Sequence, residues 1–353
     1  MSLLQLQKVE KDFKGPFAIK STTLNIQSGE FFSLLGPSGC GKTTLLKLTA
    51  GLLTPDKGDV VLDHKIITSQ ASEKRGFSMV FQEALLFPHM TAEENVAFGL
   101  KMKGIRKKQR LQKARDLLVS VGLDGFYRRY PSALSGGQRQ RVSLARAIAT
   151  EPSLLLMDEP FSALDPSLRE DMRALVARMH QEHHVTILFV THDRDEAFQL
   201  SDRIGVMEDG RILQIDRPKD LYEKPGEQNV ARYLGAKNVF YGQCREGVFL
   251  SDDFQIQCPC DHNVSQSTGW VVIRPETLTI IPKTESKGEE PNVFKGIIRD
   301  WSFRQGFYHI KVQVGYKMLE VVQYADVHLE VLEGEPIHLS VDLNQLHFIP
   351  EKG

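Results

Sequence analysis

The sequence predicts an α/β domain built on a mainly parallel sheet, interrupted by a helical insertion and followed by an all-β domain. Three observations predict this order. Up to about residue 235, short apolar strand patterns alternate with helical patterns; between about residues 84 and 150 the strand patterns are missing; after residue 235 strand patterns follow one another. A chain of 353 residues exceeds one ordinary hydrophobic core. We therefore expect domains at 1–235 and 236–353.

In the first region, three apolar strand patterns each precede a helical pattern. They are FFSLL before TTLLKLTAGLL, SLLLMD before PSLREDMRALVARMHQE, and VTILFV before RDEAFQLS. The strand patterns are continuously apolar, which is typical of parallel strands buried on both faces. Repeated strand and helix alternation predicts helices on both faces of the sheet.

The insertion at about 84–150 contains three helical patterns: TAEENVAFGLKMK, KKQRLQKARDLLVSVG and SGGQRQRVSLARAIA. The second overlaps the basic run RKKQRLQKAR, which would suit a nucleic-acid surface or a solvated helix face. Leu111, Leu117 and Leu118 lie on one side of this helix, which favours the solvated face. We expect no nucleic-acid partner.

After residue 235 the patterns are those of strands separated by polar turns: VVIRPETLTII, VFKGIIRDW, FYHIKVQV, KMLEVVQ and PIHLSVD. The segment TESKGEEPN is a polar loop within this region. The pattern predicts an all-β second domain.

Composition indicates a chain that neither spans a membrane nor leaves the cytoplasm. No window holds eighteen uninterrupted apolar residues, and the first residues lack the layout of a secretory signal. The formal net charge is −1, and the four cysteines do not form the paired framework of a small secreted protein. Two metal-site alternatives are less favoured: Cys258 with Cys260 has no second cysteine or histidine pair at a ligand-like spacing, and His180 with His184 lies near a helix end that is typical of a solvated connection.

The motif GPSGCGKTT follows the strand pattern FFSLL and precedes a helical pattern, which is the context that a phosphate-binding loop requires. Glycines let the backbone N–H groups turn inward, and the helix N-terminus adds positive partial charge. Lys42 is expected to reach the β- and γ-phosphates, and the Thr43 hydroxyl to face Mg²⁺. The predicted nucleotide-binding residues here are Gly36, Pro37, Ser38, Gly39, Cys40, Gly41, Lys42, Thr43 and Thr44.

A second motif, SLLLMDEP, ends a buried strand with two adjacent carboxylates at the sheet edge where ligands bind in such folds. We expect Asp158 to hold Mg²⁺ through water and Glu159 to polarise the attacking water as a base. Taken alone, the pair would also suit an acidic turn at a strand end.

The third motif is LSGGQ, and a chance occurrence in a chain of this length is about one in two thousand. Ser135 and the amides of Gly136 and Gly137 open a helix and so predict a second anion site. Two phosphate sites indicate one nucleotide that is held twice.

With these motifs, the first 235 or so residues resemble the nucleotide-binding subunits of ABC transporters. The resemblance implies an ATPase that uses ATP and Mg²⁺ and works as a head-to-tail homodimer, in which the signature of one chain faces the cradle of the other. It also implies a γ-phosphate contact for His192, a Mg²⁺ and water contact for Gln82, and an interface role for Asp165. Phe13 falls where the family stacks an aromatic ring on adenine, and Gln138 completes the signature.

The later region, with Arg274, Pro275 and Glu276 in VVIRPETLTI, resembles the OB-like transport-associated domain of importer ATPases. A β-sandwich used only for dimer contact is the alternative for this domain. The order of domains favours import, and the resemblance implies a peripheral subunit on the cytoplasmic face of the membrane. Its partners would be integral-membrane permease subunits and, indirectly, a substrate-binding protein.

Two other functions are alternatives to an importer ATPase. A soluble ABC ATPase without a transport role usually carries two cassettes, a long coiled coil or zinc insertions, and none is visible here. A regulatory nucleotide switch would be expected to lose Glu159 or His192, and both are present. Iron, sulfate, molybdate, polyamine, phosphonate and sugar importers carry similar ATPases, because the permease and binding protein select the solute.

Overall fold

The computed structural model describes residues 2–15, 17–251, 255–257, 267–281, 292–325 and 332–351. The chain divides into two compact units, Met1–Pro218 and Lys219–Gly353. The helices α7 (Pro218–Glu223) and α8 (Gln228–Tyr233) precede the strands of the second unit, so this division lies earlier than the predicted domain boundary at residue 235. Among the described residues, no helix combines the length and apolar character that a membrane span needs.

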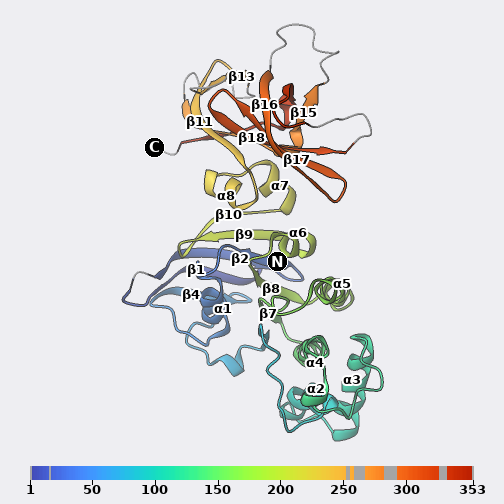
Figure 1. Ribbon diagram of the computed structural model, residues 1–353. Helices are drawn as coiled ribbons and strands as arrows, with labels where there is room; N and C mark the ends of the chain where they lie inside the picture. Colours follow the sequence, from blue (N-terminus) through green and yellow to red (C-terminus); the bar gives the residue numbers. More distant parts are fainter. Residues whose placement is uncertain are drawn as a thin grey trace. The chain divides into compact units, whose positions relative to one another are not determined.

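The first unit is organised around a six-stranded sheet of order β10-β9-β3-β8-β7-β6 (Figure 1). All neighbours in it are parallel except β9 and β10, so the predicted mainly parallel sheet is confirmed. Its strands are β3 (Phe31–Leu35), β6 (Phe77–Val80), β7 (Leu154–Asp158), β8 (Thr186–Thr191), β9 (Arg203–Glu208) and β10 (Arg211–Asp216). Every residue of β3 and β8 is buried, which explains their continuous apolar runs.

A second, antiparallel sheet in this unit was not predicted from the sequence. It has the order β2-β1-β4-β5, with strands β1 (Ser2–Asp12), β2 (Ala18–Gln27), β4 (Lys57–Leu62) and β5 (Lys65–Ile66). Its first strand buries Leu4, Leu6 and Val9 against the cluster that also covers α1 (Lys42–Ala50). One face of such a strand is solvated, so apolar and polar residues alternate along it, whereas the parallel strands are continuously apolar.

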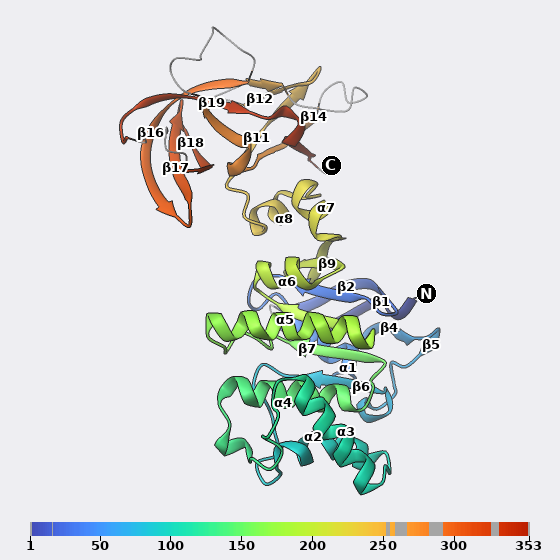
Figure 2. The same cartoon turned by 90° about the vertical axis from the view of Figure 1, so that its right-hand side faces the viewer.

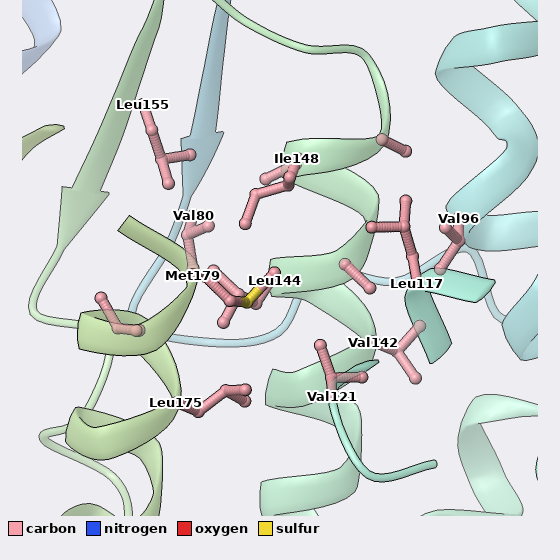
Figure 3. Close-up of a cluster of buried hydrophobic side chains, with 14 of the residues drawn as sticks. Val80, Val96, Leu117, Val121, Val142, Leu144, Ile148, Leu155, Leu175 and Met179 are labelled. Carbon is pink, nitrogen blue, oxygen red and sulfur yellow. The ribbon is translucent and has the colours of Figure 1, made fainter. Parts of the chain in front are cut away.

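The predicted helical insertion is confirmed by α2 (Ala92–Met102), α3 (Lys107–Ser120) and α4 (Gly136–Ala149), which lie together in Figures 1 and 2. Figure 3 shows how α4 joins this group to the sheet: Leu144 and Ile148 lie near Val80 and Leu155, and Val142 lies on the side of α3. Helix α5 (Pro166–His183) adds Leu175 and Met179 to the same cluster. On α3 the basic residues lie on a largely solvated face, whereas Ala114, Leu117 and Leu118 are buried.

The described strands of the second unit form two antiparallel sheets, which confirms the predicted all-β region. One has the order β13-β12-β11-β14-β20, from β11 (Asn238–Arg245), β12 (Val248–Leu250), β13 (Gln255–Gln257), β14 (Ser267–Ile273) and β20 (His347–Pro350). The other has the order β15-β19-β16-β17-β18, from β15 (Leu278–Ile281), β16 (Val293–Arg304), β17 (Phe307–Val314), β18 (Lys317–Tyr324) and β19 (Pro336–Val341). Residues of both sheets share one apolar core.

The Arg274–Glu276 motif has a structural role within this unit. The Arg274 guanidinium is buried, lies 3.8 Å from the centre of the Tyr222 ring, and donates hydrogen bonds to the carbonyl oxygens of Tyr222 and Leu234. The Tyr222 hydroxyl in turn donates to the Glu276 carboxylate. The motif therefore fastens α7 and the end of α8 to the strands.

The cysteines differ from one another. Cys40 is free and buried, whereas Cys244 on β11 is disulfide-bonded, which the residue spacing did not predict. The proposed pair Cys258 and Cys260 and most of the TESKGEEPN loop lie outside the described residues.

Candidate active site

The loop between β3 and α1 forms the predicted cradle. Gly39 and Gly41 have φ values of 83° and 112°, in the left-handed region that favours glycine. A Cβ on Gly41 would lie 2.6 Å from the Ile19 side chain, and one on Gly36 would lie 2.2 Å from the Met207 carbonyl oxygen. Gly39 is therefore required by backbone conformation, Gly36 by close packing and Gly41 by both.

Lys42 is the first residue of α1 and is 4% exposed. Its ammonium donates to the carbonyl oxygens of Gly36 at 2.8 Å and Pro37 at 2.9 Å, so its buried charge is held by the loop itself. Pro37, Ser38 and Gly39 are exposed along the outer side of the loop. The loop thus keeps the ammonium of Lys42 on its inner side, against the carbonyl oxygens of Gly36 and Pro37.

Cys40 is 4% exposed, and burial raises the pKa of its thiol. Both burial and a disfavoured thiolate reduce the reactivity of this thiol. Cys40 contributes instead to the apolar cluster beneath the loop.

The acidic motif lies directly beside the cradle. The Thr43 hydroxyl donates a hydrogen bond of 2.7 Å to Asp158 at the end of β7. Burial raises the pKa of the Asp158 carboxyl group, and the neighbouring carboxylate of Glu159 acts in the same direction. Residues 115 apart in sequence are thus joined at one edge of the sheet, as two parallel strands predict.

Glu159 and His192 form the second pair at this edge. His192 follows β8, and its Nδ1 lies 2.9 Å from the Glu159 carboxylate. Glu159 has a φ of 44°, an uncommon backbone conformation for a side chain of this size, and its N–H donates to the Val190 carbonyl oxygen at 2.9 Å. The strained backbone holds a carboxylate against an imidazole in front of Asp158, an arrangement suited to orienting a water.

The LSGGQ signature opens α4 in the predicted way. Ser135 is the N-cap, and its hydroxyl accepts from the Gln138 N–H at 3.3 Å while the Gln138 side chain accepts from the Ser135 N–H at 3.0 Å. Ser135 and Gly136 are exposed, whereas Gly137 is buried where a Cβ would lie 2.2 Å from the Leu168 side chain. The signature therefore presents a helix N-terminus at the surface.

The remaining expected site residues are Gln82, Asp165 and Phe13. Gln82 is exposed and follows β6, whose neighbour β7 carries Asp158 at its end. Asp165 caps α5 by accepting a hydrogen bond from the Leu168 N–H at 2.9 Å. Phe13 is 45% exposed, and its ring centre lies 5.9 Å from that of Phe17.

The sequence reasoning missed several residues that support the cradle. The Phe17 ring lies 3.1 Å from the position of a Cβ on Gly41, and the Gly210 N–H donates to the Cys40 carbonyl oxygen at 3.0 Å. Asp209 and Gly210 form the turn between β9 and β10, and a DG pair between apolar strands is a hairpin signal that would have found them. The contacts of Arg169 and Arg173 with the Asp193 carboxylate were also missed.

The alternative metal site at His180 and His184 finds no support within the described part of the chain. His180 Nδ1 lies 2.9 Å from the Val185 carbonyl oxygen, and its ring packs edge-on against Phe31. Among the described residues, no group of three or more His, Cys, Asp or Glu side chains could hold a metal ion.

Comparison with known proteins gives consistent matches. A family model described as ABC transporter matches residues 19–162. A spermidine/putrescine import ATP-binding protein of Chromobacterium violaceum is 42% identical over 307 residues, which cover 85% of each chain. A molybdate/tungstate import ATP-binding protein of Pyrococcus horikoshii is 35% identical over 350 residues, which cover 99% of this chain and 100% of the relative. The solved dimeric ATP-binding cassette MJ0796, bound to ADP and Pi, has a TM-score of 0.55 at 33% identity and covers 61% of this chain and 99% of the cassette.

Proposed function

The chain belongs to the ATP-binding import subunits of ABC transporters, and from this we propose that it couples ATP hydrolysis to solute uptake through the residues described above. The observation that carries the proposal is the joining of Thr43, Asp158, Glu159 and His192 at one sheet edge beside the cradle. A carboxylate beside an imidazole is suited to polarising a water, and a loop that holds a buried lysine is suited to binding phosphates.

Each expected residue takes one role in this proposal. Lys42 and the N–H groups of the loop bind the β- and γ-phosphates, Glu159 is the base, and His192 contacts the γ-phosphate. Gln82 contacts the attacking water, and Asp165 contributes to the subunit interface. Phe13 stacks on adenine through its exposed ring.

The donor set at Thr43 and Asp158 fits Mg²⁺. A hydroxyl and a carboxylate lie within 2.7 Å of each other at the edge of the cradle, and oxygen atoms are the ligands that this ion prefers. The raised pKa of Asp158 reflects a buried carboxylate, to which a nearby cation would restore favourable charge. Thr43, Asp158 and Gln82 would hold the ion, which would neutralise charge on the phosphates.

The signature supports a homodimer that closes around ATP. Ser135 and Gly136 are exposed at a helix N-terminus, an arrangement that favours binding of an anion from another molecule. We propose that they bind the γ-phosphate of a nucleotide held in the cradle of a second copy. The closed dimer is then stabilised by the free energy that corresponds to the difference in ATP affinity between the closed and open states.

The expected partners are permease subunits, with a substrate-binding protein acting through them. The chain would lie peripherally on the cytoplasmic face of the membrane. Relatives of comparable identity are named for spermidine/putrescine, molybdate/tungstate, sulfate/thiosulfate and Fe(3+) import, so an ion or a polyamine is the proposed class of solute. Calorimetry on the binding protein encoded beside this gene would identify the solute; a sugar ligand would contradict this class.

The variant Glu159→Gln tests the proposed function. Removing the base while leaving the cradle intact should lower ATP turnover by about 1,000-fold and keep ATP-driven dimerisation. Turnover is measured by phosphate release, and dimerisation by light scattering with and without ATP. The control is Glu182→Gln, an exposed carboxylate on α5 whose removal should leave both readouts unchanged. Near-normal turnover in the Glu159 variant would contradict the role of Glu159.

A further inference from the structure

Arg169 on α5 connects two loops of the active-site edge. One terminal nitrogen of its guanidinium donates to the Leu164 carbonyl oxygen at 3.2 Å, and the other lies 3.6 Å from the Asp193 carboxylate. Its side chain is 28% exposed and that of Asp193 is 25% exposed, so solvent screens this ion pair only partly. A planar guanidinium suits such a double contact because its N–H groups are fixed relative to one another.

The first of these loops begins at Glu159. Both the N–H and the hydroxyl of Ser162 donate to the Glu159 carbonyl oxygen, at 3.2 Å and 2.9 Å. The Leu164 N–H donates to the Phe161 carbonyl oxygen at 3.1 Å, so the segment is a continuous hydrogen-bonded turn. A side chain that holds Leu164 therefore restrains the backbone on which Glu159 sits.

The second loop carries His192. Asp193 follows His192 directly, accepts a hydrogen bond from the Glu196 N–H at 3.1 Å and caps α6 (Arg194–Leu200). The Asp193 N–H donates to the Thr191 hydroxyl at 3.0 Å. Holding the Asp193 carboxylate therefore fixes the turn from which the imidazole projects.

Arg173 adds a second, weaker contact to the same carboxylate, at 3.8 Å. Within the described residues, the Nε atoms of both Arg169 and Arg173 are buried without a hydrogen-bond partner. Leaving buried donors unpaired is unfavourable, so two arginines converge on Asp193 at a cost to folding. Such costs are typical of sites where geometry serves function.

We propose that Arg169 is a positioning residue for hydrolysis, which clamps the Glu159 loop to the His192 turn and so sets the contact between their side chains. Arg169 lies on α5 and links the loop that begins at Glu159 to the turn that carries His192. The contact between the Glu159 and His192 side chains is a second link between the same loop and turn. This inference rests on the proposed function, because it takes Glu159 and His192 to be the hydrolytic pair. Small displacements of such a pair lower turnover while leaving nucleotide binding intact.

The test compares steady-state ATP hydrolysis by the full chain and by variants at both ends of the clamp. Arg169→Gln should lower kcat roughly tenfold and leave KM for ATP within about twofold. Arg169→Lys keeps the charge near Asp193 and should recover part of kcat. Asp193→Asn keeps the helix cap but removes the charge, and should lower kcat to a similar extent. The loss in the double variant should be far smaller than the two single losses combined, because both changes remove the Arg169–Asp193 link and only the weaker Arg173 contact is lost in addition.

The matched control is Arg178→Gln on the same helix. Arg178 also makes a long ion pair, 3.8 Å to Glu182, and also donates to a carbonyl oxygen, that of Ser120 at 2.6 Å, but it contacts neither loop. Its kcat should be unchanged. Wild-type kcat in Arg169→Gln, or losses that add in the double variant, would overturn the proposal. If Arg169→Gln does not fold, as judged by circular dichroism, Asp193→Asn decides the question: normal kcat there would overturn the proposal.

Failure of this inference and failure of the proposed function give different results. If wild-type chain hydrolyses ATP and Glu159→Gln does not, while Arg169→Gln keeps full kcat, only the clamp is wrong. If Glu159→Gln keeps full turnover, the proposed function is wrong in its choice of base.

Discussion

The cradle at Gly36–Thr44 and the signature at Ser135–Gln138 are both loops that open a helix, yet the structure places them in opposite environments. Lys42 is 4% exposed and is held by two carbonyl oxygens of its own loop. Ser135 is exposed, and within the described part of the chain its side chain hydrogen-bonds to its own helix through the capping box. Within one chain, the cradle loop therefore holds its own lysine, whereas the signature forms a helix cap. The difference supports the proposal that the signature binds its ligand on another molecule.

Of the variants that test this difference between the two loops, Lys42→Ala should have the largest effect. It removes the buried cation that we propose faces the phosphates, and we expect ATP binding by a single chain to be lost and turnover to fall by more than about 1,000-fold. Nucleotide affinity is measured with a fluorescent ATP analogue at protein concentrations too low for dimerisation. Lys65→Ala, at an exposed position on β5, is the control. Retained affinity in Lys42→Ala would mean that the cradle is not the primary nucleotide site.

Changes at Ser135 should act on the dimer and not on the single chain. Ser135→Asp keeps a good helix cap but adds a negative charge, so it should abolish ATP-driven dimerisation while the single chain binds nucleotide normally. Ser135→Ala loses the cap and the phosphate contact, and should lower kcat roughly tenfold. Light scattering and the fluorescent analogue report the two properties separately.

The exposed Ser132, just before the signature, provides the control variant Ser132→Ala, which should behave as wild type. A loss of single-chain nucleotide affinity in Ser135→Asp would contradict the division of labour between the two loops. It would place the signature at the site of its own chain.

The contrast also explains which parts of the site could be predicted from sequence. The cradle, the acidic strand end and the signature are contiguous motifs in which local backbone conformation and a neighbouring helix fix the geometry. The contact between Thr43 and Asp158 follows because Thr43 lies in the helix that follows β3 and Asp158 ends β7, and parallel strands have their carboxyl ends at the same edge of the sheet. The antiparallel sheet was harder to foresee, since β1 pairs with β4 some fifty residues away through alternating patterns interrupted by register shifts.

Arg169 and Arg173 could not be assigned from the sequence for a different reason. On an amphipathic helix such as α5 they read as ordinary solvated charges. Their partners, Leu164 and Asp193, become neighbours only when β7 and β8 are placed side by side. The roles of the individual site residues remain proposals that the variants above test.

The smallest expected effect concerns Phe13, for which we propose a role in adenine binding at the cradle alone. Its ring is 45% exposed beside Phe17, so it offers one face to a flat ligand. Aromatic contacts are worth about 0.5–1.5 kcal/mol, so Phe13→Ala should raise KM for ATP by about two- to tenfold with kcat unchanged. Phe13→Tyr keeps the stacking face and should show neither change. Because adenine is remote from the bond that breaks, a fall in kcat without a rise in KM would mean that Phe13 supports the fold of the cradle instead of binding the base.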